Sequence, residues 1–194
     1  PSRDEPALPL VSFYDVAQLR NIERVATRIP RVGFFTTNAF LNNWATNVDN
    51  LFRVTTNQSL LVALNIGFSS SEATEPVSDE GLDAEHAASA PSCYGCHKQL
   101  DPMRLYLGHD FDVAFQLPPE SPSELSPFDR ALEPSFAFRG HRESGGDTYR
   151  FAEIMSEHPR FAHAWVQKLC VYANSERCSE YDPAFLNLVE GFVQ

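Results

Sequence analysis

The clearest hydrophobic periodicity lies in the last third of the chain. Phe151, Ile154 and Met155 recur at helical spacing, and Asp147 stands where a helix cap belongs. Pro159 suits the first position of a second helix directly afterwards. The pattern therefore predicts consecutive helices in this part of the chain.

Two further amphipathic stretches complete this region. The first has Phe161, Trp165, Leu169 and Tyr172 on one face. The second opens at Asp182-Pro183 and has Phe185, Leu188, Val189 and Phe192 as its apolar stripe. Because apolar residues recur about every 3.6 positions in both, we expect each stripe to face a core.

Two shorter helices are expected in the first half of the chain. Thr37 or Asn38 would cap the first one, since a small polar side chain there accepts a bond from an open helix amide. The second would follow Thr56 or Asn57 and end near Gly67. After the second helix the chain becomes rich in polar residues.

Long stretches between the helices lack periodicity. Residues 69–83 are rich in Ser, Glu and Asp, which predicts a solvated loop, and a short helical pattern follows at 83–90. Residues 117–135 hold five prolines, which exclude a regular element, and residues 139–146 suggest a surface turn. The chain is therefore expected to be mainly α, with two long irregular connections, as a single domain over 1–194.

Composition and charge narrow the class of protein. Hydrophobic residues make up 43% of the chain and 15 are Phe, which is enough for a substantial core. The net charge of −11 argues against nucleic-acid binding, which depends on Lys and Arg. No apolar run reaches the about 18 residues that a membrane span needs. Since the chain begins at Pro1, we expect it to be processed or cut from a longer parent protein.

The strongest chemical signal is the segment Cys93-Tyr94-Gly95-Cys96-His97. Two thiols three positions apart can add to the two vinyl groups of one haem, and the next residue can then ligate the iron. We therefore expect covalent haem at Cys93 and Cys96, with His97 as the proximal ligand. The other residues expected to contact the haem are Tyr94, Pro102 and Met103.

Two other interpretations use the same thiols. A structural zinc site would need a second pair, and Cys170 with Cys178 does not have the usual spacing. The remaining histidines are scattered, at His86, His109, His141, His158 and His163, and His141 and His158 look solvated beside charged neighbours. A redox dithiol would need a strand-to-helix context that the flanking residues lack. Both alternatives stay open beside haem.

The residues around the motif add a family resemblance. The segment "HAASAPSCYGCHKQLDPM" resembles the core of the planctomycete-type cytochrome c family, uncharacterised bacterial secreted proteins with a His before Cys-x-x-Cys-His and an Asp-Pro after it. The corresponding positions are His86, Cys93, Cys96, His97, Asp101 and Pro102, followed by Phe111-Asp112. The chain departs from the family at Leu100, where Met is frequent, and at Arg104, where Gly is frequent.

Two more segments resemble the same family. Residues 31–47 are similar to its Arg-x-Gly-x-x-Thr signature, and residues 151–176 are similar to its C-terminal helical module. The resemblance spans about residues 30–192. It implies a cytochrome-c-like helical haem domain with a haem-binding region over 30–116 and a C-terminal helical module over 136–194.

The haem hypothesis also predicts a cellular location. Covalent haem is attached outside the cytoplasm, so a periplasmic or secreted location is implied. In that oxidising space Cys170 and Cys178 would tend to form a disulfide. The alternative is two unpaired buried thiols.

The second axial ligand of the iron stays open. His86 matches a position that the family uses, but it could equally bond a propionate or the backbone. Met155 is a weaker candidate, because its apolar helical position favours a role in the core. Met103 follows the motif too closely to reach the opposite face easily, and His109 and His163 are lesser candidates. An iron without a second protein ligand is the remaining outcome.

These expectations lead to one main function and two alternatives. The main one is a mono-haem c-type cytochrome that transfers single electrons outside the cytoplasm to a redox partner with a basic docking patch. The first alternative is a haem enzyme or small-ligand binder with an open distal site, similar to a peroxidase. The second is a zinc-stapled structural domain.

Overall fold

The computed structural model describes most of the chain and confirms a mainly α fold. It covers residues 17, 20–21, 32–47, 50–68, 91–111 and 132–193. In chain order the elements are η1 (Phe34–Thr36), α3 (Asn38–Asn43), α4 (Arg53–Leu64), α6 (Pro91–Gly108), β1 (Ser135–Phe138), β2 (His141–Ser144), α7 (Thr148–Glu157), α8 (Arg160–Asn174) and α9 (Pro183–Val193). His86, the helix expected at 83–90 and most of the loops expected at 69–83 and 117–135 lie outside these residues.

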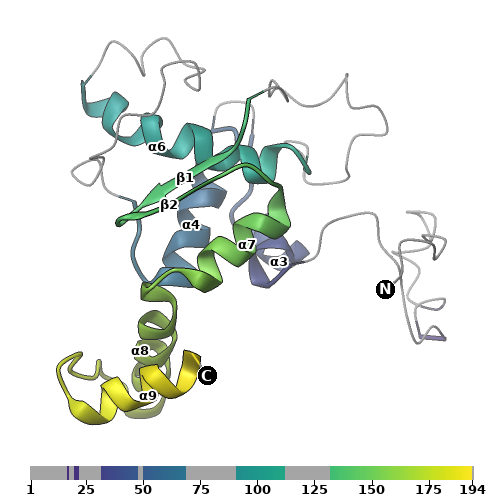
Figure 1. Cartoon of the computed structure of the whole chain (residues 1–194). Helices are drawn as coiled ribbons and strands as arrows, with labels where there is room; N and C mark the ends of the chain where they lie inside the picture. The colour runs from purple at the N-terminus through teal and green to yellow at the C-terminus, as the bar shows by residue number, and fades with distance from the viewer. Residues whose placement is uncertain are drawn as a thin grey trace.

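The helices gather around a small hairpin, and the C-terminal pair extends away from it (Figure 1). The long helix α6 packs against β1 and against α4, and α7 contacts both α4 and α6. Helix α8 leaves this body, and α9 packs back along it. The body and the α8–α9 pair therefore have separate interiors.

A cluster of aromatic rings lies in the main core. Phe151 of α7 stacks on Tyr106 of α6 with ring centroids 5.4 Å apart, and Phe35 meets it edge-on at 5.6 Å. Phe136 of β1 lies 6.3 Å from the same ring. Burial raises the pKa of Tyr106 to about 12, so its phenol stays neutral. The ring of Phe151, on α7, is thus in contact with residues of α6, β1 and η1.

Helix α3 confirms its predicted cap, whereas α4 has different ends from those expected. The side chain of Thr37 accepts a bond from the amide of Phe40, as a capping threonine should. Helix α4 begins at Arg53, not after Thr56, because the left-handed backbone of Phe52 turns the chain earlier. Its last residue is Leu64, and Asn65 after it takes the left-handed conformation, so the helix stops before Gly67, near which its end was expected.

Helix α7 confirms the predicted break and cap. The carboxylate of Asp147 accepts bonds from the amides of Tyr149 and Arg150. The hydroxyl of Thr148 donates to the carbonyl of Tyr106, and the Thr148 amide donates to Asp110. The first turn of α7 is therefore attached to the end of α6.

The apolar stripes of α8 and α9 are only partly buried, which corrects the expectation for both. Phe161 and Trp165 are half-buried against the body, but the exposed fractions of Leu169 and Tyr172 are 57% and 89%. The reason is that α8 leaves the body halfway along and turns another face to α9. That satellite core consists of Ala162, Val166, Cys170, Phe185 and Val189, while Leu188 and Phe192 of the predicted α9 stripe are exposed.

A hairpin stands where a surface turn was expected. Strands β1 and β2 pair antiparallel from Ser135 opposite Ser144 to Phe138 opposite His141. Both turn residues, Arg139 and Gly140, have positive φ, at 50° and 82°, which matches the twist of a two-residue hairpin. Alternate residues of β1 are buried, so its two phenylalanines enter the core.

Among the helices that the structure describes, none combines the length and the apolar character needed to cross a membrane.

Candidate functional site

The three motif residues lie on the first half of one helix. Cys93, Cys96 and His97 belong to α6 at positions i, i+3 and i+4, so they share a face. All three are half-buried, and neither thiol is in a disulfide. The fold thus presents both thiols and the imidazole together, which is the donor set that covalent haem requires.

A buried carboxylate lies directly behind the imidazole. Nδ1 of His97 is 3.0 Å from Oδ2 of Asp101, one helical turn further along α6. The side chain of Asp101 is fully buried, whereas that of His97 is 14% exposed. Because Nδ1 is engaged in this way, Nε2 is the nitrogen through which His97 would ligate a metal.

Two arginines compensate the charge of this carboxylate. Nε of Arg53, at the start of α4, donates to Oδ1 of Asp101 at 2.5 Å. Nε of Arg104 lies 3.5 Å from the same oxygen, and a second nitrogen of Arg104 donates to the carbonyl of Leu51 at 3.2 Å. Asp101 therefore has the partners that a buried charge needs, and they come from two helices.

Sequence reasoning missed both arginines. Arg104 is only 1% exposed and lies in an otherwise apolar helical run, which is a signal because an arginine is almost never fully buried unless it is paired. Arg53 gives no such signal, since its role depends on how α4 packs on α6. Arg104 is therefore part of the buried group of charges around Asp101.

Pro102 lies inside α6, and the helix continues through it. A proline has no amide hydrogen, so the carbonyl of Lys98 loses its usual helical donor at this point. Pro102 and Met103 are both buried, and Met103 is fully inside the main core. Tyr94 instead stays half-buried on the motif turn, with the ammonium of Lys98 5.4 Å from its ring centroid.

The thiol environment does not resemble a redox-active pair. Burial and the neighbouring Cys93 raise the pKa of the Cys96 thiol above its ordinary value. Reactive dithiols need the opposite, a depressed pKa that populates the thiolate.

The predicted pairing of the other two cysteines is confirmed. Cys170 and Cys178 form a disulfide with their Cα atoms 5.7 Å apart. The zinc interpretation would have needed these thiols as its second ligand pair. Within the described ranges, no three His, Cys, Asp or Glu side chains form a cluster that could hold a metal ion.

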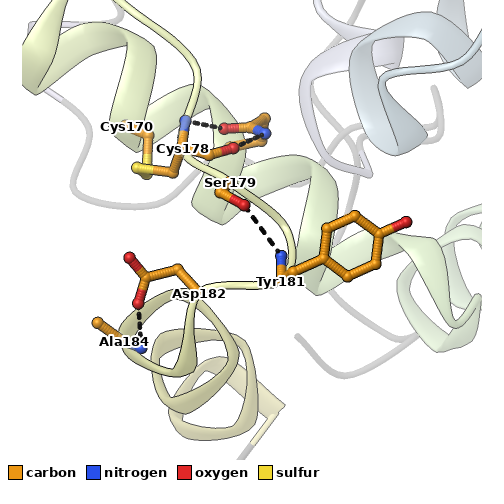
Figure 2. The surroundings of a disulfide bond; sticks show 7 residues. Cys170, Cys178, Ser179, Tyr181, Asp182 and Ala184 are labelled. Carbon is orange, nitrogen blue, oxygen red and sulfur yellow. Dashed lines mark hydrogen bonds between the residues drawn. A yellow bond between two sulfur atoms is a disulfide. The ribbon is translucent and has the colours of Figure 1, made fainter.

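The disulfide is held by a polar clamp (Figure 2). The side-chain amide of Gln167 donates to the carbonyl of Cys178, and its oxygen accepts from the Cys178 amide, each at 2.9 Å. Gln167 is 3% exposed, so this pair of bonds is shielded from water. Beside the disulfide, a groove of about 530 Å³ separates α8 from α9; its lining has no charged side chain.

The candidates for the second axial position are not brought together with His97 by any described contact. Met155 is 1% exposed and packs in the main core, which supports the core interpretation of this residue. His86 lies outside the described residues. The charged neighbours of His158 suggested a solvated side chain, but the residue is buried, at 3% exposure. Nε2 of its ring is hydrogen-bonded to the Phe138 carbonyl at 3.2 Å.

Comparison with family models, with curated proteins and with solved structures found no match to this chain. Function is therefore inferred from the motif, its geometry and the surroundings of His97.

Proposed function

We propose that the protein is a mono-haem c-type cytochrome that transfers single electrons outside the cytoplasm. The observation that carries the proposal is the placement of Cys93, Cys96 and His97 on one face of α6. Cys93 and Cys96 would form the two thioethers, and Nε2 of His97 would ligate the iron. The haem would supply a one-electron redox centre, and the chain would orient and shield it.

The disulfide between Cys170 and Cys178 favours haem over zinc at the motif. Zinc sites in proteins are usually closed by four nitrogen or sulfur ligands. Cys170 and Cys178 already bond each other, so they are not available as the second pair. A disulfide is also typical of oxidising compartments, which agrees with a periplasmic or secreted haem protein.

The proposed partner is a redox protein with a basic docking patch. The chain carries 26 acidic and 15 basic side chains, apart from histidine. Such a surface attracts a basic partner and speeds association, and added salt weakens this steering. The same acidic composition argues against nucleic acid as a partner.

The test is maturation in a host that attaches haem c. We expect the purified chain to gain the mass of one haem and to show sharp α and β absorption bands on reduction. Replacement of both thiols, Cys93→Ser with Cys96→Ser, should abolish the covalent mass gain. The matched control is Cys170→Ser with Cys178→Ser, which removes two cysteines outside the motif and should leave attachment intact.

The same preparation separates the alternatives. Bound zinc with no iron would replace the haem proposal by the zinc-stapled domain. Carbon monoxide binding to the reduced protein, with a shifted absorption band, would favour the open-site haem enzyme over the electron carrier. An unchanged low-spin spectrum would support the carrier, and the spectra of His86→Ala and Met155→Leu would then identify the second ligand.

A further inference from the structure

The contact between His97 and Asp101 is more strongly constrained than an ion pair on the surface. The carboxylate is fully buried, and its two oxygens have different partners: Oδ2 faces Nδ1 of His97, and Oδ1 faces Arg53 and Arg104. A carboxylate in this position can rotate little, because both ends are held. The oxygen that faces His97 is therefore fixed in place.

An imidazole held by such an oxygen has a defined orientation and proton position. An ionised carboxylate only accepts hydrogen bonds, so the proton of the pair belongs on Nδ1 of His97. A carboxylate behind a ligating histidine also raises the basicity of the ring as a metal ligand. A more basic ligand stabilises ferric over ferrous iron, which lowers the midpoint potential.

We propose that Asp101 is a positioning residue for His97. It sets the Nδ1–H tautomer, orients Nε2 towards the metal and lowers the midpoint potential of the bound haem, while Arg53 and Arg104 hold its carboxylate in place. This inference rests on the proposed function only where it concerns the haem. The tautomer of His97 is a property of the chain itself.

The first experiment examines the full chain without haem. Nitrogen-correlated NMR of the His97 ring is recorded well above the ordinary imidazole pKa of about 6.5, where the ring is neutral. We expect the Nδ1–H tautomer in the wild type. Asp101→Leu removes the acceptor and should shift the ring towards the Nε2–H tautomer. The Nε2–H tautomer in the wild type would overturn the inference.

The second experiment measures the midpoint potential of the haem-loaded protein. Asp101→Asn has nearly the same shape but no charge, so the potential should rise. Arg53→Gln leaves the carboxylate less compensated, so the potential should fall. The matched control is Asp110→Asn, because Asp110 follows the same helix but bonds the Thr148 amide instead; its potential should stay at the wild-type value.

The outcomes separate the two proposals. A chain that takes up no haem but keeps the Nδ1–H tautomer contradicts the proposed function and leaves the positioning role of Asp101 supported. A haem protein whose potential is the same in Asp101→Asn and in the wild type contradicts the inference and leaves the function supported. If Asp101→Asn does not fold, the midpoint potential of Arg53→Gln tests the inference instead. Arg53 lies at the start of α4 and its side chain is 13% exposed, so this change should be tolerated better.

Discussion

At the scale of residues, the chemistry concentrates on a few buried polar groups. Asp101 and Arg104 sit inside the protein at 0% and 1% exposure, and their charges offset each other. His158 is also deeply buried, at 3% exposure. Because these groups are buried, changing the charge or the partners of Arg104 or His158 should alter stability more than the same change at an exposed residue.

Arg104→Met should destabilise the fold. The change removes one cation from the buried Asp101, which keeps Arg53, and removes the donor to the half-buried Leu51 carbonyl. Weakening a buried charge pair and leaving a carbonyl without its donor costs about 2–3 kcal/mol. Chemical denaturation measures this loss. The control Arg177→Met, with a side chain 66% exposed, should stay within about 0.5 kcal/mol of the wild type.

Stability should fall in mild acid because of His158. Its Nδ1 accepts from the Arg160 amide, so its Nε2–H donates to the Phe138 carbonyl, and the ring must be neutral for both bonds. Burial lowers the pKa of His158 below 6.5. The unfolded chain therefore binds the proton more readily, and the stability present above pH 6.5 is lost as the pH falls through the folded pKa.

The measurement is the free energy of unfolding across this pH range, for the wild type and for His158→Asn. The difference between the two curves should shrink towards acid pH. A constant difference would show that His158 does not titrate on unfolding.

Residues of the motif could be predicted from the sequence, but their supporting contacts could not. Cys93, Cys96 and His97 are adjacent in the chain, and so their joint chemistry is visible there. The pairing of Arg53 with Asp101 joins positions 48 residues apart, and no local pattern encodes it. His158 looked solvated because its neighbours are charged, although the ring itself turns inward.

At the scale of elements, local signals succeeded where a helix has a capping side chain. Thr37 and Asp147 were both expected as caps and both accept amide bonds. The predicted start of α4 was wrong because this helix has no side-chain cap and follows the left-handed Phe52. The hairpin was missed because its strands have only four residues each, too few for periodicity to be seen.

Asp147→Ala should weaken α7. The carboxylate satisfies two amides of the first turn, and removing such a cap typically costs about 1 kcal/mol. Thermal denaturation should show a lower midpoint for Asp147→Ala. Asp147→Asn, which keeps a capping oxygen, should lie close to the wild type; an equal loss in both variants would mean that the charge, not the cap, matters.

At the scale of the whole molecule, the described chain has two interiors of unequal size. The main core joins α4, α6, α7 and the hairpin, whereas the satellite core joins only α8 and α9. Helix α8 connects them: the ammonium of Lys168 bonds the Val62 carbonyl in α4 and lies 5.0 Å from the Trp165 ring centroid. Since the satellite core is small, it depends on its covalent link.

Removing that link should therefore act locally. Cys170→Ser with Cys178→Ser opens a loop with a sequence separation of 8, which is worth about 2.5 kcal/mol in chain entropy. We expect amides of α9 to exchange hydrogen faster while those of α4 and α6 keep their protection. Uniformly faster exchange would contradict the picture of two cores.

The long-range pair of Arg53 and Asp101 also has a consequence for the order of events in biosynthesis. The thiols and imidazole of the motif are contiguous in the chain, so on the proposed function they are ready for cofactor attachment before any tertiary structure exists. Asp101, by contrast, gains Arg53 only after α4 has docked on α6. On the proposed function, the support that Arg53 gives to Asp101, and through it to His97, is therefore completed only when the chain folds, later than the thiols become available for attachment.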